Sequence, residues 1–138
     1  MNLVVYYDSN KDILQIVEKF RKDYNANVYK IETIDKVNFI TKLKNSKVAI
    51  KRCNLNLSRF DNIILISSMW NNEVPSPVIR FLEQLTGKVK NIIYVLYNNN
   101  KEDKPECFDK MDKILNLRRM KSYFVTLNKK DINVRVYQ

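Results

Sequence analysis

The chain has 138 residues, of which 45% are hydrophobic, and a formal net charge of +10 at pH 7. This length suits a single domain over residues 1–138 with a core of its own. No stretch is apolar for long enough to cross a bilayer, so we expect a cytoplasmic protein whose partners do not include a membrane. Histidine is absent, which excludes histidine-based nucleophile pairs and most zinc sites. We therefore assign no catalytic residue and no metal ligand, and any redox chemistry would come from a cofactor.

Apolar runs and amphipathic repeats alternate along the chain. Asn2–Tyr7 is a predicted strand, and Lys11–Tyr24 a predicted helix with apolar residues on one face. The continuous apolar runs Ile63–Ile66 and Ile92–Leu96 are typical of strands buried on both faces of a parallel sheet. The other predicted strands are Val28–Ile31, Asn62–Ile66, Asn91–Tyr97 and Ser122–Leu127, and the other predicted helices are Lys36–Val48, Pro77–Thr86 and Glu106–Met120.

Two of these helices carry more specific expectations. In Lys36–Val48 the spacing places Val37, Ile40 and Leu43 on one inward face. Gly87, the only glycine in the chain, is well placed to end the helix before it as the C′ residue.

Five strands alternating with four helices predict an α/β fold, a doubly wound parallel sheet of order 2-1-3-4-5. The remaining tail, Asn128–Gln138, is too short for a full fifth helix, and Val134 and Val136 alternate with polar residues. We therefore expect the tail to run extended and to leave an apolar strip beside the fifth strand. A homodimer, or docking onto a larger partner, would cover such a strip.

Ligands of open α/β sheets bind beyond the carboxyl ends of the strands. The third strand ends at Ser67 and Ser68, and the only tryptophan, Trp70, follows. Its ring would either stack on a planar ligand while exposed at the strand end, or fold over the sheet as a plug.

With this order of elements the chain resembles the flavodoxin-like superfamily over nearly its whole length. The segment Ser67–Leu85 (SSMWNNEVPSPVIRFLEQL) carries the resemblance most clearly. More narrowly, Glu73–Leu82 (EVPSPVIRFL) and Tyr123–Ile132 (YFVTLNKKDI) are similar to segments of the NrdI family, the flavodoxin-like partners of class Ib ribonucleotide reductase.

The resemblance implies an FMN-dependent electron carrier or reductase component, a flavoprotein that works with a redox or assembly partner. The FMN phosphate would lie against the loop after the first strand, and the flavin ring between Trp70 and the loop after the fourth strand. The candidate FMN-binding residues that follow from the resemblance are Ser9, Asn10, Lys11, Ser67, Ser68, Trp70, Asn98 and Asn99.

The phosphate loop departs from the family pattern, S/T-x-T-G-N-T. This chain has Asp8–Ile13 (DSNKDI) there, so that Lys11 replaces the glycine and Asp8 and Asp12 add negative charge. The alternative for this loop is that Ser9 or Asn10 caps the helix, and the alternative for the asparagines after the fourth strand is a solvated turn. The alternative function is a flavodoxin fold that has lost FMN and acts as a protein-binding or assembly partner.

The positive charge is concentrated in one segment, because every charged side chain between Lys36 and Phe60 is basic. Such a face would attract an acidic protein, which we expect in preference to nucleic acid. An AT-rich genome, which favours lysine and asparagine codons, would produce the same composition without any partner.

Overall fold

The computed structural model describes residues 1–8, 10–98, 102–128 and 131–138. Within them, one sheet has the strand order β2-β1-β3-β4-β5-β6, parallel throughout except that β6 runs antiparallel to β5. The strands are β1 Asn2–Tyr7, β2 Ala26–Lys30, β3 Asn62–Ser68, β4 Ile92–Tyr97, β5 Lys121–Asn128 and β6 Asp131–Tyr137. The helices are α1 Lys11–Asp23, α2 Phe39–Lys44, α3 Ser76–Leu85 and α4 Glu106–Leu115, with a 3-10 turn at Leu57–Arg59.

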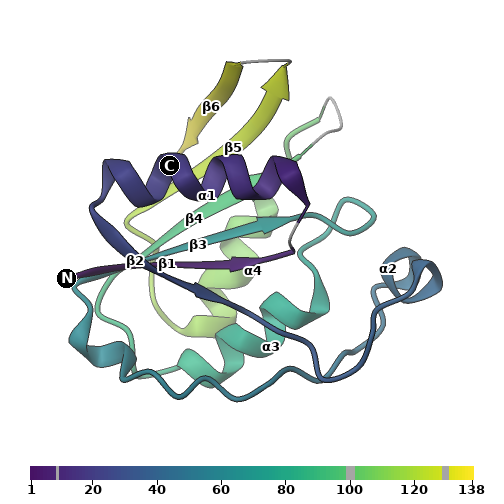
Figure 1. Ribbon diagram of the computed structural model, residues 1–138, viewed down its shortest axis with the longest axis horizontal. Helices are drawn as coiled ribbons and strands as arrows, with labels where there is room; N and C mark the ends of the chain where they lie inside the picture. The colour runs from purple at the N-terminus through teal and green to yellow at the C-terminus, as the bar shows by residue number, and fades with distance from the viewer. Residues whose placement is uncertain (9, 99–101, 129–130) are drawn as a thin grey trace.

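The α/β class and the mostly parallel sheet are confirmed, but the predicted sheet of five strands is wrong, because the tail adds β6. Figure 1 shows α1 on one face of the sheet and α3 with α4 on the other. No helix within the described ranges is both long and apolar enough to cross a membrane.

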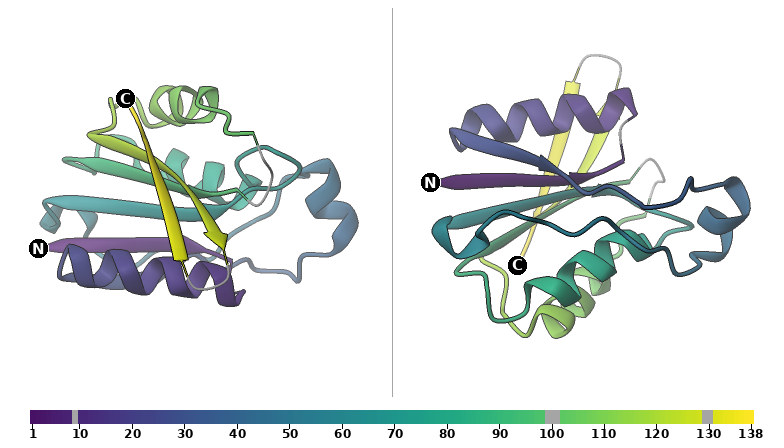
Figure 2. Two further views of the ribbon diagram at one scale, coloured as in Figure 1. Left: turned by 90° about the horizontal axis from the view of Figure 1, so that it is seen from above. Right: turned by 60° about the horizontal axis from the view of Figure 1, so that its bottom comes forward.

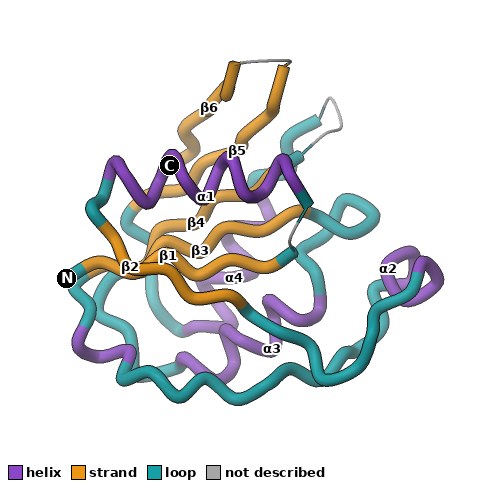
Figure 3. Tube along the Cα trace, in the orientation of Figure 1, coloured by secondary structure: helices purple, strands orange, loops and turns teal. Residues whose placement is uncertain are grey.

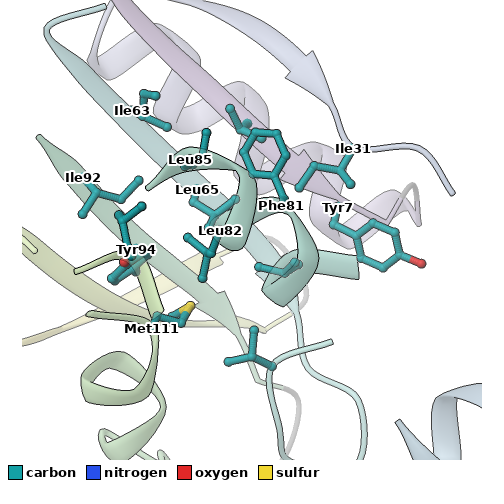
Figure 4. Packing of buried hydrophobic residues seen from close by; sticks show 14 of the residues in the cluster. Tyr7, Ile31, Ile63, Leu65, Phe81, Leu82, Leu85, Ile92, Tyr94 and Met111 are labelled. Carbon is teal, nitrogen blue, oxygen red and sulfur yellow. The ribbon is translucent and has the colours of Figure 1, made fainter. Parts of the chain in front are cut away.

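The core consists of two layers separated by the sheet. On β3, Ile64 and Ile66 face α1, whereas Ile63 and Leu65 belong to the cluster on the α3 and α4 side. Figure 4 shows the second layer, in which Phe81 of α3 and its neighbours lie against the sheet. The alternation follows from the two-residue period of a strand, so each apolar run supplies both layers.

The helix predicted over Glu106–Met120 is shorter than the sequence suggested. It ends at Leu115, because Asn116 adopts a left-handed conformation with φ of 55°. By contrast, α3 ends close to where it was expected, and Gly87 follows it with φ of 78°. A left-handed residue at this position suits glycine and terminates the helix.

The helix predicted over Lys36–Val48 is wrong in length and in orientation. It is reduced to α2, none of whose side chains is buried, and Ile40 and Leu43 are 61% and 53% exposed; Val37 is half-buried. An asparagine caps each end of α2. The segment before α2 pairs with the segment after it, since the N–H of Ile34 donates to the carbonyl of Ala49. Figure 3 shows the resulting excursion, which carries α2 away from the sheet.

The C-terminal tail runs extended, as predicted, but it does not leave β5 unpaired. β6 pairs with β5 along its whole length, and the hairpin lies across the sheet toward α1 (Figure 2). The ring of Tyr123 packs 5.7 Å from that of Phe20, and Ile132 and Val134 join the core layer on the α1 side. The hairpin thus covers part of the surface that a fifth helix would have covered.

We expect Phe108→Ala to lower the free energy of unfolding by about 3–5 kcal/mol, since it opens a cavity in the core. Phe108 is fully buried on α4, and its ring contacts those of Tyr94, Phe124 and Tyr137. Phe39→Ala on α2 is the matched control and should change stability by less than about 0.5 kcal/mol, because that ring is exposed. Urea unfolding of the two variants checks this; equal losses would contradict the fold described.

Candidate functional site

The loops after β1, β3 and β4 meet at the carboxyl edge of the sheet. At the end of β1, Asp8 has a φ of 81°, and its carboxylate accepts a hydrogen bond of 3.0 Å from the hydroxyl of Ser68 at the end of β3. The neighbouring Ser67 is fully buried, and its hydroxyl donates to the carbonyl of Ser68. Both serines are buried, and of the two it is Ser68, 9% exposed, that is bonded to the loop after β1.

The first turn of α1 contributes both attraction and repulsion for an anion. Asn10 is the N-cap, and its side-chain oxygen accepts the N–H of Ile13 at 2.9 Å. The first N–H groups of a helix have no intrahelical acceptor and form its positive end, and Lys11 is exposed beside them. Asp12 lies in the same turn, where its carboxylate accepts a 2.8 Å hydrogen bond from the hydroxyl of Tyr97.

The hydrogen bond to Asp12 favours the protonated form of Tyr97. Burial, followed by this hydrogen bond, raises the pKa of Tyr97 to about 12. The hydroxyl, which is protonated at neutral pH as in any tyrosine, ties the end of β4 to the start of α1.

Trp70 is buried, being only 3% exposed. Its ring meets that of Tyr7 edge to face, with centroids 5.7 Å apart. The turn that places it runs from Trp70 to Glu73, which exchange two backbone hydrogen bonds, and Asn71 and Asn72 between them both have positive φ. This is the geometry of a type I′ turn, which asparagine tolerates. Of the alternatives for Trp70, the buried ring agrees with a plug folded over the sheet and not with a ring exposed at the strand end.

Asn98 is also buried, and its backbone N–H donates to the carbonyl of Val125. Its side-chain amide donates to the carbonyl of Glu102, across the loop. Asn98 thus fastens the base of the loop instead of forming a solvated turn. Ser9 and Asn99, the other two candidates, lie outside the residues that the structure describes.

The loop after β4 is held by β6 in a way that the sequence did not reveal. Arg135 donates two hydrogen bonds to the carboxylate of Asp103, at 2.7 and 2.9 Å, and the hydroxyl of Tyr137 donates to it at 2.6 Å. Hydrogen bonding from Arg135 lowers the pKa of Asp103. A charge-assisted, two-pronged pair of this kind is among the stronger polar contacts in proteins.

A cavity of about 810 Å³ lies elsewhere, between residues 50–58 and the C-terminal end of α3. It is distant from the carboxyl edge, because Gly87 and Lys88 at the opposite edge line it. Among the described residues, no group of three or more histidine, cysteine, aspartate or glutamate side chains could hold a metal ion. The carboxyl edge is therefore the candidate site on topological grounds, and its side chains suit hydrogen bonding more than catalysis.

No protein-family model matches this sequence, and no curated protein matches it. Solved structures do match its fold. A candidate flavoprotein from Bacteroides eggerthii superposes with a TM-score of 0.76 at 17% identity, over 94% of this chain and 89% of that one. A flavoprotein from Lactobacillus acidophilus in complex with FMN has a TM-score of 0.68 at 12% identity, over 91% of both chains. The apo form of the flavoprotein from the same organism has a TM-score of 0.69 at 12% identity, over 94% of this chain and 93% of that one.

These likenesses show that the chain has a flavodoxin-like fold. Identities this low say nothing about which side chains bind a ligand. The fold also matches the FMN complex and the apo form about equally, so the match does not distinguish a protein with FMN from one without it.

We expect Trp70→Phe to change the free energy of unfolding by less than about 1.5 kcal/mol, because it keeps an aromatic ring on Tyr7. It also removes a buried indole N–H that has no hydrogen-bond partner among the described residues, and such a donor is costly to bury. Trp70→Ala should cost about 3–5 kcal/mol. Because Trp70 is the only tryptophan, unfolding is best followed by circular dichroism. A Phe variant as unstable as the Ala variant would contradict this expectation.

We also expect the contribution of Asp103 to stability to depend on pH. Its folded-state pKa is lowered, so the stabilisation is fully present above the unfolded-state value of about 3.9 and is lost as the pH falls through the lower folded value. The difference in unfolding free energy between wild type and Asp103→Asn should therefore shrink below about pH 4. Urea unfolding at a series of pH values checks this, and a constant difference would contradict it.

Proposed function

We propose that this chain binds FMN at the carboxyl edge of its sheet and acts as a flavoprotein that passes electrons to or from a partner protein. The observation that carries the proposal is the fold shared with an FMN-complexed flavoprotein over 91% of this chain. The convergence of the loops after β1, β3 and β4 supports it, since ligands of such sheets bind at this edge.

The residues at this edge fit FMN in kind. Backbone N–H groups at the start of α1, with Lys11 beside them, would hold the phosphate. Ser68 and the backbone around Asn98 would border the flavin ring. Because the indole of Trp70 packs on Tyr7, it would stack on the flavin only by giving up that contact. The bound flavin would supply the electron transfer, and the protein would orient it and keep water away.

Two carboxylates at the edge oppose the phosphate. Asp8 accepts a hydrogen bond from Ser68 and Asp12 one from Tyr97, and a hydroxyl donor such as that of Tyr97 does not neutralise the charge of Asp12. A phosphate at the start of α1 would therefore meet negative charge from Asp12 in the same turn. We infer that FMN binds more weakly than it would to a neutral loop.

The alternative is a flavodoxin-like fold that has lost FMN and acts as a protein-binding or assembly partner. The burial of Trp70 and the carboxylates of Asp8 and Asp12 favour it specifically. The visible spectrum of the purified protein separates the two functions, because bound oxidised flavin absorbs visible light. If the spectrum shows no flavin, titration of FMN fluorescence should show quenching; its absence well above micromolar concentrations would overturn FMN binding.

We expect Asp12→Asn to strengthen FMN binding by about fivefold. Removing one charge a few ångströms from the phosphate is worth about 1 kcal/mol where the pair is screened as in bulk water, and the amide oxygen of asparagine still accepts from Tyr97. Glu83→Gln, which changes the same charge on α3, is the control and should leave the affinity unchanged. Fluorescence titration measures both, and equal affinities for wild type and Asp12→Asn would place the phosphate elsewhere.

A further inference from the structure

Helix α2 stands away from the body of the protein, beyond the carboxyl edge of the sheet (Figures 1 and 2). It exposes Phe39, Ile40 and Leu43 to solvent, with Phe39 at 75%, and Ile34 in the loop before it is 60% exposed. Large apolar side chains gathered in this way mark an interaction site more often than chance. We call Phe39, Ile40 and Leu43, with Lys42 and Lys44 between and after them, the α2 surface.

The charge of α2 and of the segment that follows it is of one sign, since the acidic residues nearest in sequence, Glu32 and Asp35, lie before Lys36. The exposed side chains of Lys36, Lys42, Lys44 and Lys47 lie within a few residues of its apolar side chains. Among the described residues of the segment between Lys36 and Phe60, only Lys51 has an ion pair, with Glu32. Two copies of such a surface would repel each other, whereas an acidic partner would be attracted and oriented.

The α2 surface is fastened to the loop after β3. The side chain of Asn45, which ends α2, donates to the carbonyl of Val74 at 2.9 Å and accepts the N–H of Ser76 at 2.8 Å. Asn71, in the turn next to Trp70, donates to the carbonyl of Leu43 at 3.2 Å. A protein bound to α2 would therefore lie beside one of the loops that border the candidate FMN site.

We propose that the α2 surface is the docking site of an acidic electron-transfer protein. Phe39, Ile40 and Leu43 form the apolar centre of the contact, and the lysines form its charged rim, which is the usual anatomy of an interface. An apolar centre of only three side chains suits a weak complex brought together by charge, as in electron-transfer encounters. The inference rests on the proposed function for the identity of the partner, but the docking itself does not require FMN.

The test uses an acidic plant-type [2Fe–2S] ferredoxin as the probe, with fluorescence anisotropy of the labelled ferredoxin at low ionic strength. We expect wild type to bind it and added salt to weaken the complex. Lys42→Glu/Lys44→Glu and, separately, Phe39→Ser/Leu43→Ser should each weaken binding by about tenfold or more. Lys110→Glu/Lys113→Glu makes the same charge change on exposed lysines of α4 and should alter binding by less than about twofold.

Three outcomes would overturn the proposal: no binding of ferredoxin by wild type, an equal loss in the α4 control, or no loss in Phe39→Ser/Leu43→Ser. Sedimentation with phosphatidylglycerol vesicles tests whether the α2 surface binds a membrane instead of a protein. Binding to these vesicles that is lost in Phe39→Ser/Leu43→Ser, without ferredoxin binding, would assign the surface to a membrane instead. All measurements are made with and without added FMN. If the protein binds ferredoxin but does not bind FMN, the proposed function is refuted and the docking site is retained.

Discussion

The burial of β3 and β4 on both faces is the constraint on which the rest of the structure depends. All six residues of β4 are buried, and they divide between the two core layers. Each such side chain contributes about 1.5–3 kcal/mol only while water is excluded from its face of the sheet. Both faces must therefore be covered along their whole width. On one face α3 and α4 do this, and on the other α1 contacts β5 through Phe20 and Tyr123, and the β5–β6 hairpin completes the cover.

The same constraint explains how much of the fold could be predicted. Strands buried on both faces leave unmistakable apolar runs, so Ile63–Ile66 and Ile92–Leu96 fixed the class of the fold and the place of the carboxyl edge. The alternation of Val134 and Val136 indicated an extended tail, but a period of two does not say which strand it pairs with. In the helix predicted over Lys36–Val48 the spacing was helical, yet periodicity cannot tell whether the apolar face reaches a core. In the folded protein the segment after α2 pairs with the segment before it, through Ala49 and Ile34, and the apolar face of α2 does not reach the core.

The candidate site was predictable in its location and much less so in its contacts. Sequence position placed Asn10, Ser68 and Asn98 at one edge, because strand ends of a parallel sheet share that edge. The hydrogen bonds that arrange the edge join residues far apart: 60 positions for Ser68 and Asp8, and 85 for Tyr97 and Asp12. A single sequence carries no signal for such pairs. The inward turn of Trp70 likewise depends on two successive left-handed asparagines, a backbone choice that composition permits but does not dictate.

The two loops beside the candidate FMN site are each held by an element outside the minimal pattern of five parallel strands. The loop after β3 is bonded to the end of α2 through Asn45, and the loop after β4 is bonded to β6 through Asp103 and Arg135. Rigid support of this kind is what a binding site needs, because loops alone lose entropy when they order around a ligand. Since the supports come from the excursion and the tail, a change in either would alter the edge without touching a residue that borders it. Side chains remote from the edge, Asn45 and Arg135 above all, therefore belong to any physical account of what this edge can bind.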